Sequence, residues 1–338
     1  MKAITELDNM LTSPSDRLIA DLKKIDGDIL ILGVGGKMGP TLAKLAKRAI
    51  DEGNLEKRVI GVSRFLSGNL REELEAAGIE TISCDLLNDE ALQALPNVKN
   101  IIYMAGNKFG TVGNEHFTWA MNAYLAGRIA EKFKDSQIVA FSTGNVYPLT
   151  NVLTNGCTED FPVNPVGEYA QSCLGRERIL TYFSHKHQTP MLIFRLNYAI
   201  DLRYGVLLEI AKHVYEGKAI DLSMGNVNVI WQGDANEYAL RSLRHVDYPP
   251  TILNITGPET LSVRWVAKEF GKRFGKEALY VNEESDKALL NNASQAHKLF
   301  GYPRVSVQEM MDMVADWVAN GGEMHNKPTH FQEREGAF

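Results

Sequence analysis

The chain has 338 residues, of which 44% are hydrophobic and 23% are charged, and its formal net charge is −6. This composition is typical of a globular protein of about two domains, and the acidic balance argues against a nucleic-acid partner. No apolar run approaches the roughly 20 residues that cross a bilayer, so no membrane partner is expected.

No segment of the sequence points to secretion, to a disulfide framework or to a metal. The first residues, MKAITELDNMLTSPSDR, lack the apolar core of a secretory signal. The three cysteines, Cys84, Cys157 and Cys173, lie far apart and have neither CxxC nor zinc spacing. This cysteine pattern favours a reducing compartment, so we predict a cytoplasmic protein. The histidines do not cluster, so we predict no metal site.

Residues 1–27 are predicted to form a helical leader, in which Ser13 or Ser15 caps a helix. Strands and helices then alternate up to residue 198. The predicted strands are DILILG, RVIGVSR, IETISCD, NIIYMAG, QIVAFST and TPMLIFRLN. The predicted helices are KMGPTLAKLAKRAIDEG, LREELEAAG, HFTWAMNAYLAGRIAEKF and EYAQSCLGRERILTYFSHKH. This alternation indicates an α/β fold with a Rossmann-type doubly wound parallel sheet.

Beyond Asn197 the alternation loosens. We predict that residues 28–198 form a dinucleotide-binding domain, rejoined by about 226–256, where VNVIWQ and TILNIT are predicted strands. Residues 199–225 and 257–322 are predicted to form a smaller C-terminal substrate-binding part, with one helix capped by Ser262. Residues 323–338 are a polar tail that we expect to be loosely held.

A glycine-rich turn, GVGGKMG, lies directly between the first strand of this region and the helix that follows it. Gly33, Gly36 and Gly39 permit positive φ angles and a close approach of a ligand to the backbone. The helix would present free N–H groups and a positive dipole end to a pyrophosphate. We therefore predict a dinucleotide site that includes Lys37 and Met38; the alternative is a tight turn without a ligand.

Residues at the ends of the second and third strands bear on the cofactor. An acidic residue after the second strand would bind the ribose of NAD, but the chain has Ser63 and Arg64 there. A guanidinium beside a serine suits a 2′-phosphate, so we predict NADP, with NAD as the alternative; Arg64 would otherwise be a solvated surface charge. Asp85, beside Leu86, either accepts from the adenine amino group or caps the next helix.

Several motifs occur in an order and at a spacing that resemble one protein family. They are GVGGKMG, CDL, YMAG, FSTGNVYP, TEDFPVNPVGEYAQSC and FRLNYA. From Asp28 to about Trp317 the chain resembles the extended short-chain dehydrogenases/reductases, the NAD(P)-dependent sugar epimerases and dehydratases. The resemblance implies an NAD(P) cofactor, a carbohydrate-like substrate and a homodimer formed through the two long helices.

The resemblance also implies roles for single residues. Tyr169 would move a proton at the reacting hydroxyl or carbonyl, and Thr143 would hydrogen-bond the same oxygen. Asn122 resembles the asparagine of the family's proton relay, and Asn197 and Asn145 are expected to face the substrate. The residues implied to line the cofactor after the fourth strand are Ala105, Gly106 and Asn107.

The chain departs from the family at one position of the catalytic helix. The family has a lysine four residues after the tyrosine, and this chain has Cys173. Tyrosine has an ordinary pKa of about 10 and needs a nearby positive charge to act as a base at neutral pH, which a thiol does not supply. We predict that Lys108 is the substitute and that Arg176 lies too far along the helix.

Three interpretations of this change stay open. Another cation replaces the lysine, or the oxidised nicotinamide alone tunes Tyr169, or the protein binds NAD(P) as a regulator or scaffold without turnover. We predict an NAD(P)-dependent oxidoreductase or epimerase acting on a carbohydrate hydroxyl or carbonyl, with the scaffold as the alternative. Cys173 is expected to be a buried, inert thiol.

The segment from Gly225 to Glu237 bears on the substrate. Family members that act on nucleotide sugars usually have an arginine there for the diphosphate, but this segment has no basic residue. Arg203 and Arg241 are the candidates for a replacement. Trp231 and Gln232 offer an apolar face and an amide, which suit a free sugar, a sugar acid or a glycoside; the alternative for Trp231 is core packing.

Overall fold

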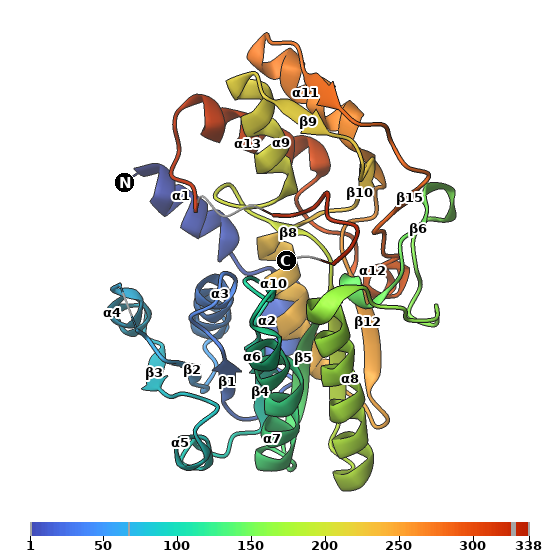
Figure 1. The fold of residues 1–338 in the computed structure, drawn as a ribbon. Coiled ribbons are helices and arrows are strands. Elements are labelled where there is room, and N and C mark those ends of the chain that lie inside the picture. Colours follow the sequence, from blue (N-terminus) through green and yellow to red (C-terminus); the bar gives the residue numbers. More distant parts are fainter. Residues whose placement is uncertain (1, 67, 326–328, 337–338) are drawn as a thin grey trace.

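The computed structural model describes residues 2–66, 68–325 and 329–336. Figure 1 shows a sheet with helices along it in the lower half of the view and a smaller group of helices and short strands above it. The helices are α1 (Lys2–Leu11), α2 (Asp16–Leu22), α3 (Gly39–Glu52), α4 (Leu70–Ala76), α5 (Asp89–Gln93), α6 (Glu115–Trp119), α7 (Leu125–Lys132), α8 (Gly167–His187), α9 (Val206–Glu216), α10 (Gln232–Arg241), α11 (Val263–Phe274), α12 (Ser294–Phe300) and α13 (Val307–Ala319).

The central sheet has the strand order β3-β2-β1-β4-β5-β7-β12, and each neighbouring pair is parallel. Its strands are β1 (Ile29–Leu32), β2 (Val59–Ser63), β3 (Glu80–Ser83), β4 (Asn100–Tyr103), β5 (Gln137–Thr143), β7 (Met191–Leu196) and β12 (Thr251–Ile255). The order reverses at β1, which pairs with β2 on one side and with β4 on the other. The predicted doubly wound parallel sheet is therefore confirmed.

Alternate residues of each strand face opposite sides of the sheet, because side chains in a strand alternate. Ile29 and Ile31 of β1 lie in a core shared with α2, α3 and α10. Leu30 and Leu32 of the same strand lie in a second core shared with α5, α7 and α8. Both faces of the sheet are thus covered by helices, which explains why the run DILILG is apolar without alternation.

A third core, above the sheet in Figure 1, is formed by α9, α11 and α13 together with leucines of α1. The short strands pair beside it in twos: β6 (Thr150–Asn151) with β15 (Lys287–Ala288), β8 (Ala199–Ile200) with β11 (Ile230–Trp231), β9 (Ala219–Asp221) with β14 (Leu279–Val281), and β10 (Asn226–Val227) with β13 (Leu261–Ser262). The segment VNVIWQ, predicted as one strand, therefore contributes to two separate pairings, whereas TILNIT extends the central sheet as β12. The short 3-10 turns are η2 (Gly144–Val146), η3 (Val152–Thr154) and η4 (Ser242–Arg244).

Helix caps decide three of the sequence predictions. The side chain of Ser15 accepts a hydrogen bond from Leu18 N, so Ser15 rather than Ser13 caps α2. Ser262 caps α11 as predicted. The predicted alternative role of Asp85 as a helix cap is wrong, because Asn88 caps α5.

The long helix predicted from residue 116 to 133 is interrupted in the middle. Between α6 and α7 the chain forms a π-helical turn, η1 (Ala120–Tyr124). Such turns insert one residue into a helix and often occur at functional sites. This turn carries the buried Asn122.

The expectation that the tail is loosely held is wrong for residues 329–336. The backbone N–H and hydroxyl of Thr329 donate to the Glu209 carboxylate of α9, at 2.9 and 2.6 Å. Phe331 is buried in the third core. Residues 326–328 and 337–338 of the predicted tail lie outside the described residues.

Candidate active site

The residues predicted to act together follow four neighbouring strands of the sheet. Gly33 follows β1, Ala105 follows β4, Thr143 ends β5, and Asn197 follows β7. These strands are adjacent and parallel, so their carboxyl ends meet at one edge of the sheet. In open parallel sheets this edge, next to the point where the strand order reverses, is where ligands bind.

The glycine-rich turn brings the backbone after β1 close to the loop after β4. Gly33 has a φ of +93°, and a Cβ atom on it would lie 2.6 Å from Ala105 N. Helix α3 begins at Gly39, and its N-cap residue Met38 makes no side-chain capping hydrogen bond. Gly39 N donates to the Gly36 carbonyl at 3.2 Å and Pro40 has no N–H, so α3 offers an anion the positive end of its dipole rather than a row of free N–H groups.

Lys37 extends from the glycine-rich turn toward the short strand β8. Its Nζ donates to the Ala199 carbonyl at 3.2 Å and lies 3.9 Å from the centre of the Tyr204 ring. The lysine therefore links the nucleotide turn to the segment that follows Asn197.

Ser63 and Arg64 lie at the end of β2, next to the glycine-rich turn. A Cβ atom on Gly35 would approach Ser63 Cβ to 3.2 Å, so the turn and the serine are in contact. Arg64 is exposed and forms no ion pair with any residue that the structure describes. At the end of β3, Asp85 is exposed and accepts from Leu87 N, and Leu86 is buried. Arg64 thus presents an exposed guanidinium at the end of β2.

Tyr169 lies in the first turn of α8, and the structure brings it to Thr143 at the end of β5. Its phenol has hydrogen-bond contacts with the Thr143 hydroxyl and the Cys173 thiol. Burial raises the pKa of Tyr169 well above its ordinary value, and Cys173 raises it further. The Thr143 hydrogen bond and the positive charge of Arg176 lower the Tyr169 pKa. The phenol is therefore a proton donor at neutral pH unless positive charge is added near it.

Cys173 is buried, and burial raises its pKa to about 11. It is therefore a neutral thiol at physiological pH, as expected for an inert cysteine. Lys108, in the loop after β4, places its Nζ 5.9 Å from the centre of the Tyr169 ring. Burial lowers the pKa of Lys108 to about 8. Its charge is therefore present at neutral pH and is lost as the pH rises through about 8.

Asn122, on the π-helical turn, holds the loop that follows β4. Its Oδ1 accepts from Asn107 N at 2.8 Å and from Arg176 Nη2 at 3.1 Å. Its Nδ2 donates to the Asn107 carbonyl at 2.8 Å and to the Ser172 hydroxyl at 2.9 Å. All four hydrogen-bonding positions of the amide are occupied, so Asn122 fixes the backbone beside Gly106.

The expectation that Arg176 lies too far from Tyr169 is wrong. The arginine is two helical turns beyond the tyrosine, but its side chain reaches back across the loop after β4. Its Nη2 donates to the Ala105 carbonyl at 2.8 Å, and its charge acts on Tyr169.

The predicted substrate residues fall into two groups. Asn145 accepts a hydrogen bond from the Thr143 hydroxyl at 2.9 Å and is half-buried beside it. Asn197 is buried and donates to Asn228 Oδ1 at 3.0 Å. Trp231 is 1% exposed inside the third core, and Gln232 is 0% exposed and donates to the Thr41 hydroxyl. Trp231 therefore packs in the core, which was its alternative role. Neither Trp231 nor Gln232 exposes a surface that a substrate could contact.

Sequence reasoning missed a buried amide beside Thr143. Asn291 is 1% exposed, and its side-chain nitrogen and oxygen have no hydrogen-bond partner among the described residues. A Cβ atom on Gly144 would lie 2.5 Å from Asn291 Oδ1. No local pattern could have revealed this contact, because Gly144 and Asn291 are far apart in the sequence.

The tail also reaches this region. The backbone of Gly336 packs against Gly167, where α8 begins, so that a Cβ atom on Gly167 would lie 2.7 Å from Gly336 Cα. Arg334 donates to the carbonyls of Ser223 and Lys287, at 2.9 and 2.8 Å. Residues 329–336 therefore connect the third core to the first turn of the helix that carries Tyr169.

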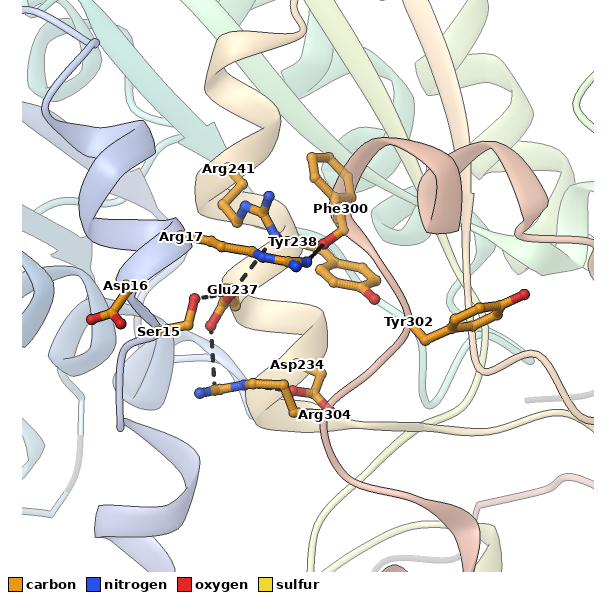
Figure 2. A pocket seen from close by; sticks show the side chains of 10 residues that line it. All are labelled: Ser15, Asp16, Arg17, Asp234, Glu237, Tyr238, Arg241, Phe300, Tyr302 and Arg304. Carbon is orange, nitrogen blue, oxygen red and sulfur yellow. Dashed lines mark hydrogen bonds and ion pairs between the residues drawn. The ribbon is translucent and has the colours of Figure 1, made fainter.

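Arg241, a candidate for binding a diphosphate, lines a different cavity. Figure 2 shows this cavity, of about 410 Å³, between α2, α10 and the segment from Phe300 to Arg304. Arg241 is buried there, donates to Asp21 at 2.8 Å and to the Phe300 carbonyl, and is thus unavailable to a substrate. Arg203 is paired with Asp201 at 3.2 Å. Apart from Arg241, none of the predicted site residues lines this cavity.

The described part of the chain has neither a cluster of metal-ligating side chains nor a helix that could span a membrane. No group of three or more histidine, cysteine, aspartate or glutamate side chains is placed to hold a metal ion in the ranges 2–66, 68–325 and 329–336. None of the helices in these ranges is both long and apolar enough to span a membrane.

The family model of the NAD dependent epimerase/dehydratase family matches residues 29–236, more than half of the chain. The protein therefore belongs to this family. None of the curated protein sequences matches the chain.

Three solved structures have the same fold. UDP-glucuronic acid 4-epimerase from Bacillus cereus, solved with NAD, is 19% identical, with 87% of this chain and 97% of that chain covered and a TM-score of 0.70. UDP-glucose 4-epimerase from Thermotoga maritima is 15% identical, with 87% and 99% covered and a TM-score of 0.70. dTDP-glucose 4,6-dehydratase from Streptomyces venezuelae is 16% identical, with 87% and 97% covered and a TM-score of 0.72.

Proposed function

We propose that the protein is an NAD(P)-dependent oxidoreductase or epimerase that acts on a hydroxyl or carbonyl of a carbohydrate-like substrate. The observation that carries the proposal is the contact of Tyr169 with Thr143 at the sheet edge that also holds the glycine-rich turn. Bound NAD(P)⁺ would supply hydride acceptance from the carbon that bears the reacting hydroxyl. Membership of the epimerase/dehydratase family supports this chemistry.

The protein's own residues would move the proton and hold the reacting oxygen. Thr143 would hydrogen-bond the substrate oxygen, and Tyr169 would take its proton in the oxidation and return it in the reduction. Asn122 would keep the loop from Ala105 to Asn107 in place along the cofactor. Lys108 is the predicted helper cation, and its Nζ lies near the Tyr169 ring.

The proposed cofactor is NADP, with NAD as the alternative. The exposed guanidinium of Arg64, which has no ion-pair partner in the described ranges, supports NADP. The family model and the NAD-bound Bacillus cereus neighbour support the alternative. In both cases the turn from Gly33 to Gly39 would hold the pyrophosphate, and Asp85 would lie on the adenine side.

The proposed substrate is a free sugar, a sugar acid or a glycoside. Arg241 is buried elsewhere, and Arg203 already pairs with Asp201, so neither replaces the missing diphosphate arginine. The structural neighbours act on nucleotide sugars, which is the competing substrate class. Residues 199–225 and 257–322 would form the substrate-binding part, with Asn145 and Asn197 as the proposed contacts.

A homodimer is proposed through the helices that carry Asn122 and Tyr169. Exposed aromatic side chains lie along them: Trp119 and Tyr124 are 38% and 58% exposed, and Tyr182 of α8 is 61% exposed. Aromatic residues are enriched at protein interfaces. The protein is proposed to act in the cytoplasm, where its unpaired cysteines would stay reduced.

Fluorescence titration with NADPH and with NADH tests the cofactor part of the proposal. We expect saturable binding, tighter for NADPH. Sugars, sugar acids, glycosides and nucleotide sugars are then screened at the nicotinamide absorbance, and epimerisation, which leaves that absorbance unchanged, is followed by proton NMR of the sugar. A folded protein that binds neither nucleotide would instead support the non-catalytic scaffold.

A further inference from the structure

Arg176 is a buried cation whose hydrogen bonds all go to neutral groups. It is 4% exposed, and its guanidinium donates to the carbonyls of Asn122, Phe141 and Ala105 at 3.0, 2.8 and 2.8 Å. It forms no ion pair with a described residue. The adjacent Glu177 is already bound by Arg195, at 2.7 Å. A buried charge without a counter-charge is strongly unfavourable, so this arrangement calls for a function.

The guanidinium lies directly behind the loop that is proposed to hold the cofactor. A Cβ atom on Gly106 would lie 2.5 Å from Arg176 Nη2. Arg176 Nη2 also donates to Asn122 Oδ1, and the Asn122 amide in turn binds both backbone groups of Asn107. Arg176 therefore braces the loop and the π-helical turn at the same time.

Arg176 is also connected to the helix turn that carries Tyr169. Asn122 Nδ2 donates to the Ser172 hydroxyl, and that hydroxyl donates to the Tyr169 carbonyl at 2.9 Å. The charge of Arg176 on α8 lowers the Tyr169 pKa, and Lys108 Nζ on the loop after β4 lies 5.9 Å from the Tyr169 ring. The thiol of Cys173 interacts with the charges of Arg176, Glu177 and Lys108. Arginine keeps its charge at every physiological pH, whereas Lys108 loses its charge as the pH rises through its lowered pKa of about 8.

We propose that Arg176 is a positioning residue that replaces the lysine absent at Cys173: it holds the loop after β4 and supplies a permanent positive charge behind Tyr169. This inference rests on the proposed role of Tyr169 in proton transfer. On this inference, Lys108 stabilises the ionised phenol of Tyr169 less than Arg176 does.

The ionisation of Tyr169 tests this inference directly and needs no substrate. The full-length protein is made with difluorotyrosine at position 169, whose more acidic phenol titrates at an accessible pH, and the titration is followed by fluorine NMR. We expect Arg176→Met to raise the midpoint by about one pKa unit or more and Arg176→Lys to restore most of the difference, because a nearby cation favours the phenolate. An unchanged midpoint in a folded Arg176→Met protein would overturn the inference.

Lys108→Met provides a second test should Arg176→Met not fold. Lys108→Met is expected to shift the titration midpoint of the phenol by less than about half a pKa unit. A shift of about one unit or more in Lys108→Met would mean that the lysine supplies the charge, which contradicts the inference. Difluorotyrosine at Tyr302, which is 72% exposed and lies outside the proposed site, is the control, and its midpoint should be the same in all variants.

The experiment separates the two proposals. A turnover that survives Tyr169→Phe would remove the proposed catalytic role while leaving the measured electrostatic effect of Arg176 intact. A normal midpoint in Arg176→Met would remove the inference while leaving the catalytic role of Tyr169 open to its own test.

Discussion

The two ends of the proposed site are built in different ways. At the nucleotide end, the glycine-rich turn and the end of β2 offer the positive end of the α3 dipole and the exposed Arg64. At the catalytic end, Asn122, Arg176, Glu177 and Arg195 are buried, and Arg176 donates to Asn122 while Arg195 pairs with Glu177. A substitution at the first end should therefore change ligand binding alone, whereas one at the second should change chemistry, stability or both.

The largest effect is expected for Tyr169→Phe, because it removes the proposed proton-transferring group and leaves its ring in place. Turnover of a substrate found by screening should fall by roughly 10²–10⁴-fold, while NADPH binding by fluorescence stays within a factor of two or so. Tyr302→Phe, at a tyrosine that is 72% exposed and outside the proposed site, is the control and should be neutral. Retained turnover in Tyr169→Phe would show that the catalytic end does not work through this phenol.

Glu177→Ala should produce the largest loss of stability at the catalytic end. It leaves Arg195, whose side chain is 4% exposed, without its counter-charge and frees the Ser142 hydroxyl. Removing one partner of a buried pair costs about 3–5 kcal/mol, measured as the free energy of unfolding in urea.

The matched control for this pair is Glu75→Ala. Glu75 pairs with Arg71 on the surface of α4, where both side chains are about half exposed. We expect a change of at most about 1 kcal/mol there. Equal losses for Glu75→Ala and Glu177→Ala would contradict the contrast between a buried and an exposed pair.

Arg64→Ala should affect the nucleotide end without destabilising the protein. Loss of a charged hydrogen-bonding partner of the 2′-phosphate should weaken NADPH binding by about 1.5–3 kcal/mol and leave NADH binding nearly unchanged. Arg64→Lys should recover part of the difference, and Arg71→Ala, on the same surface, should have no effect. Equal weakening of NADPH and NADH would mean that Arg64 does not select the cofactor.

The smallest effect is expected for Lys108→Met, and it should depend on pH. The pKa of Lys108 is lowered to about 8, so the wild-type charge assists Tyr169 below that pH and is lost above it. The variant should be slower below about pH 8, should match the wild type above it, and should have a higher pH optimum. Lys108→Arg keeps the charge and should stay fast above pH 8. Superimposable pH–rate profiles for the wild type and Lys108→Met would exclude Lys108 as a helper cation.

Much of the fold could be predicted because the signals are local. Uninterrupted apolar runs such as Ile29–Leu32 specify strands buried on both faces, and Ser15 and Ser262 specify helix starts through their own side chains. The order of motifs then gave the family, and it placed Thr143 and Tyr169 together before any geometry was known. The contact of these two side chains follows from the family's layout of β5 and α8.

Other features were missed because they depend on contacts between distant segments. From the sequence, Trp231 could equally bind a sugar or pack in the core. Its position among the residues of the third core shows that it packs there. The tail is polar in composition, yet Phe331 and Thr329 dock on residues far away in the chain. Composition gives the average polarity of a segment and cannot identify the surface that it meets.

The sequence by itself determined the alternation of strands and helices, the glycine-rich turn, the family and the absence of the helix lysine, because each is written in neighbouring residues. Only the tertiary structure decided which groups lie near Cys173, where the lysine is missing. The reach of Arg176 to the Ala105 carbonyl, the π-helical turn at Asn122 and the burial that lowers the pKa of Lys108 all arise where β4, β5 and α8 meet. Hydrogen bonds and desolvation depend on atoms brought together by packing, and packing joins residues that no sequence pattern pairs.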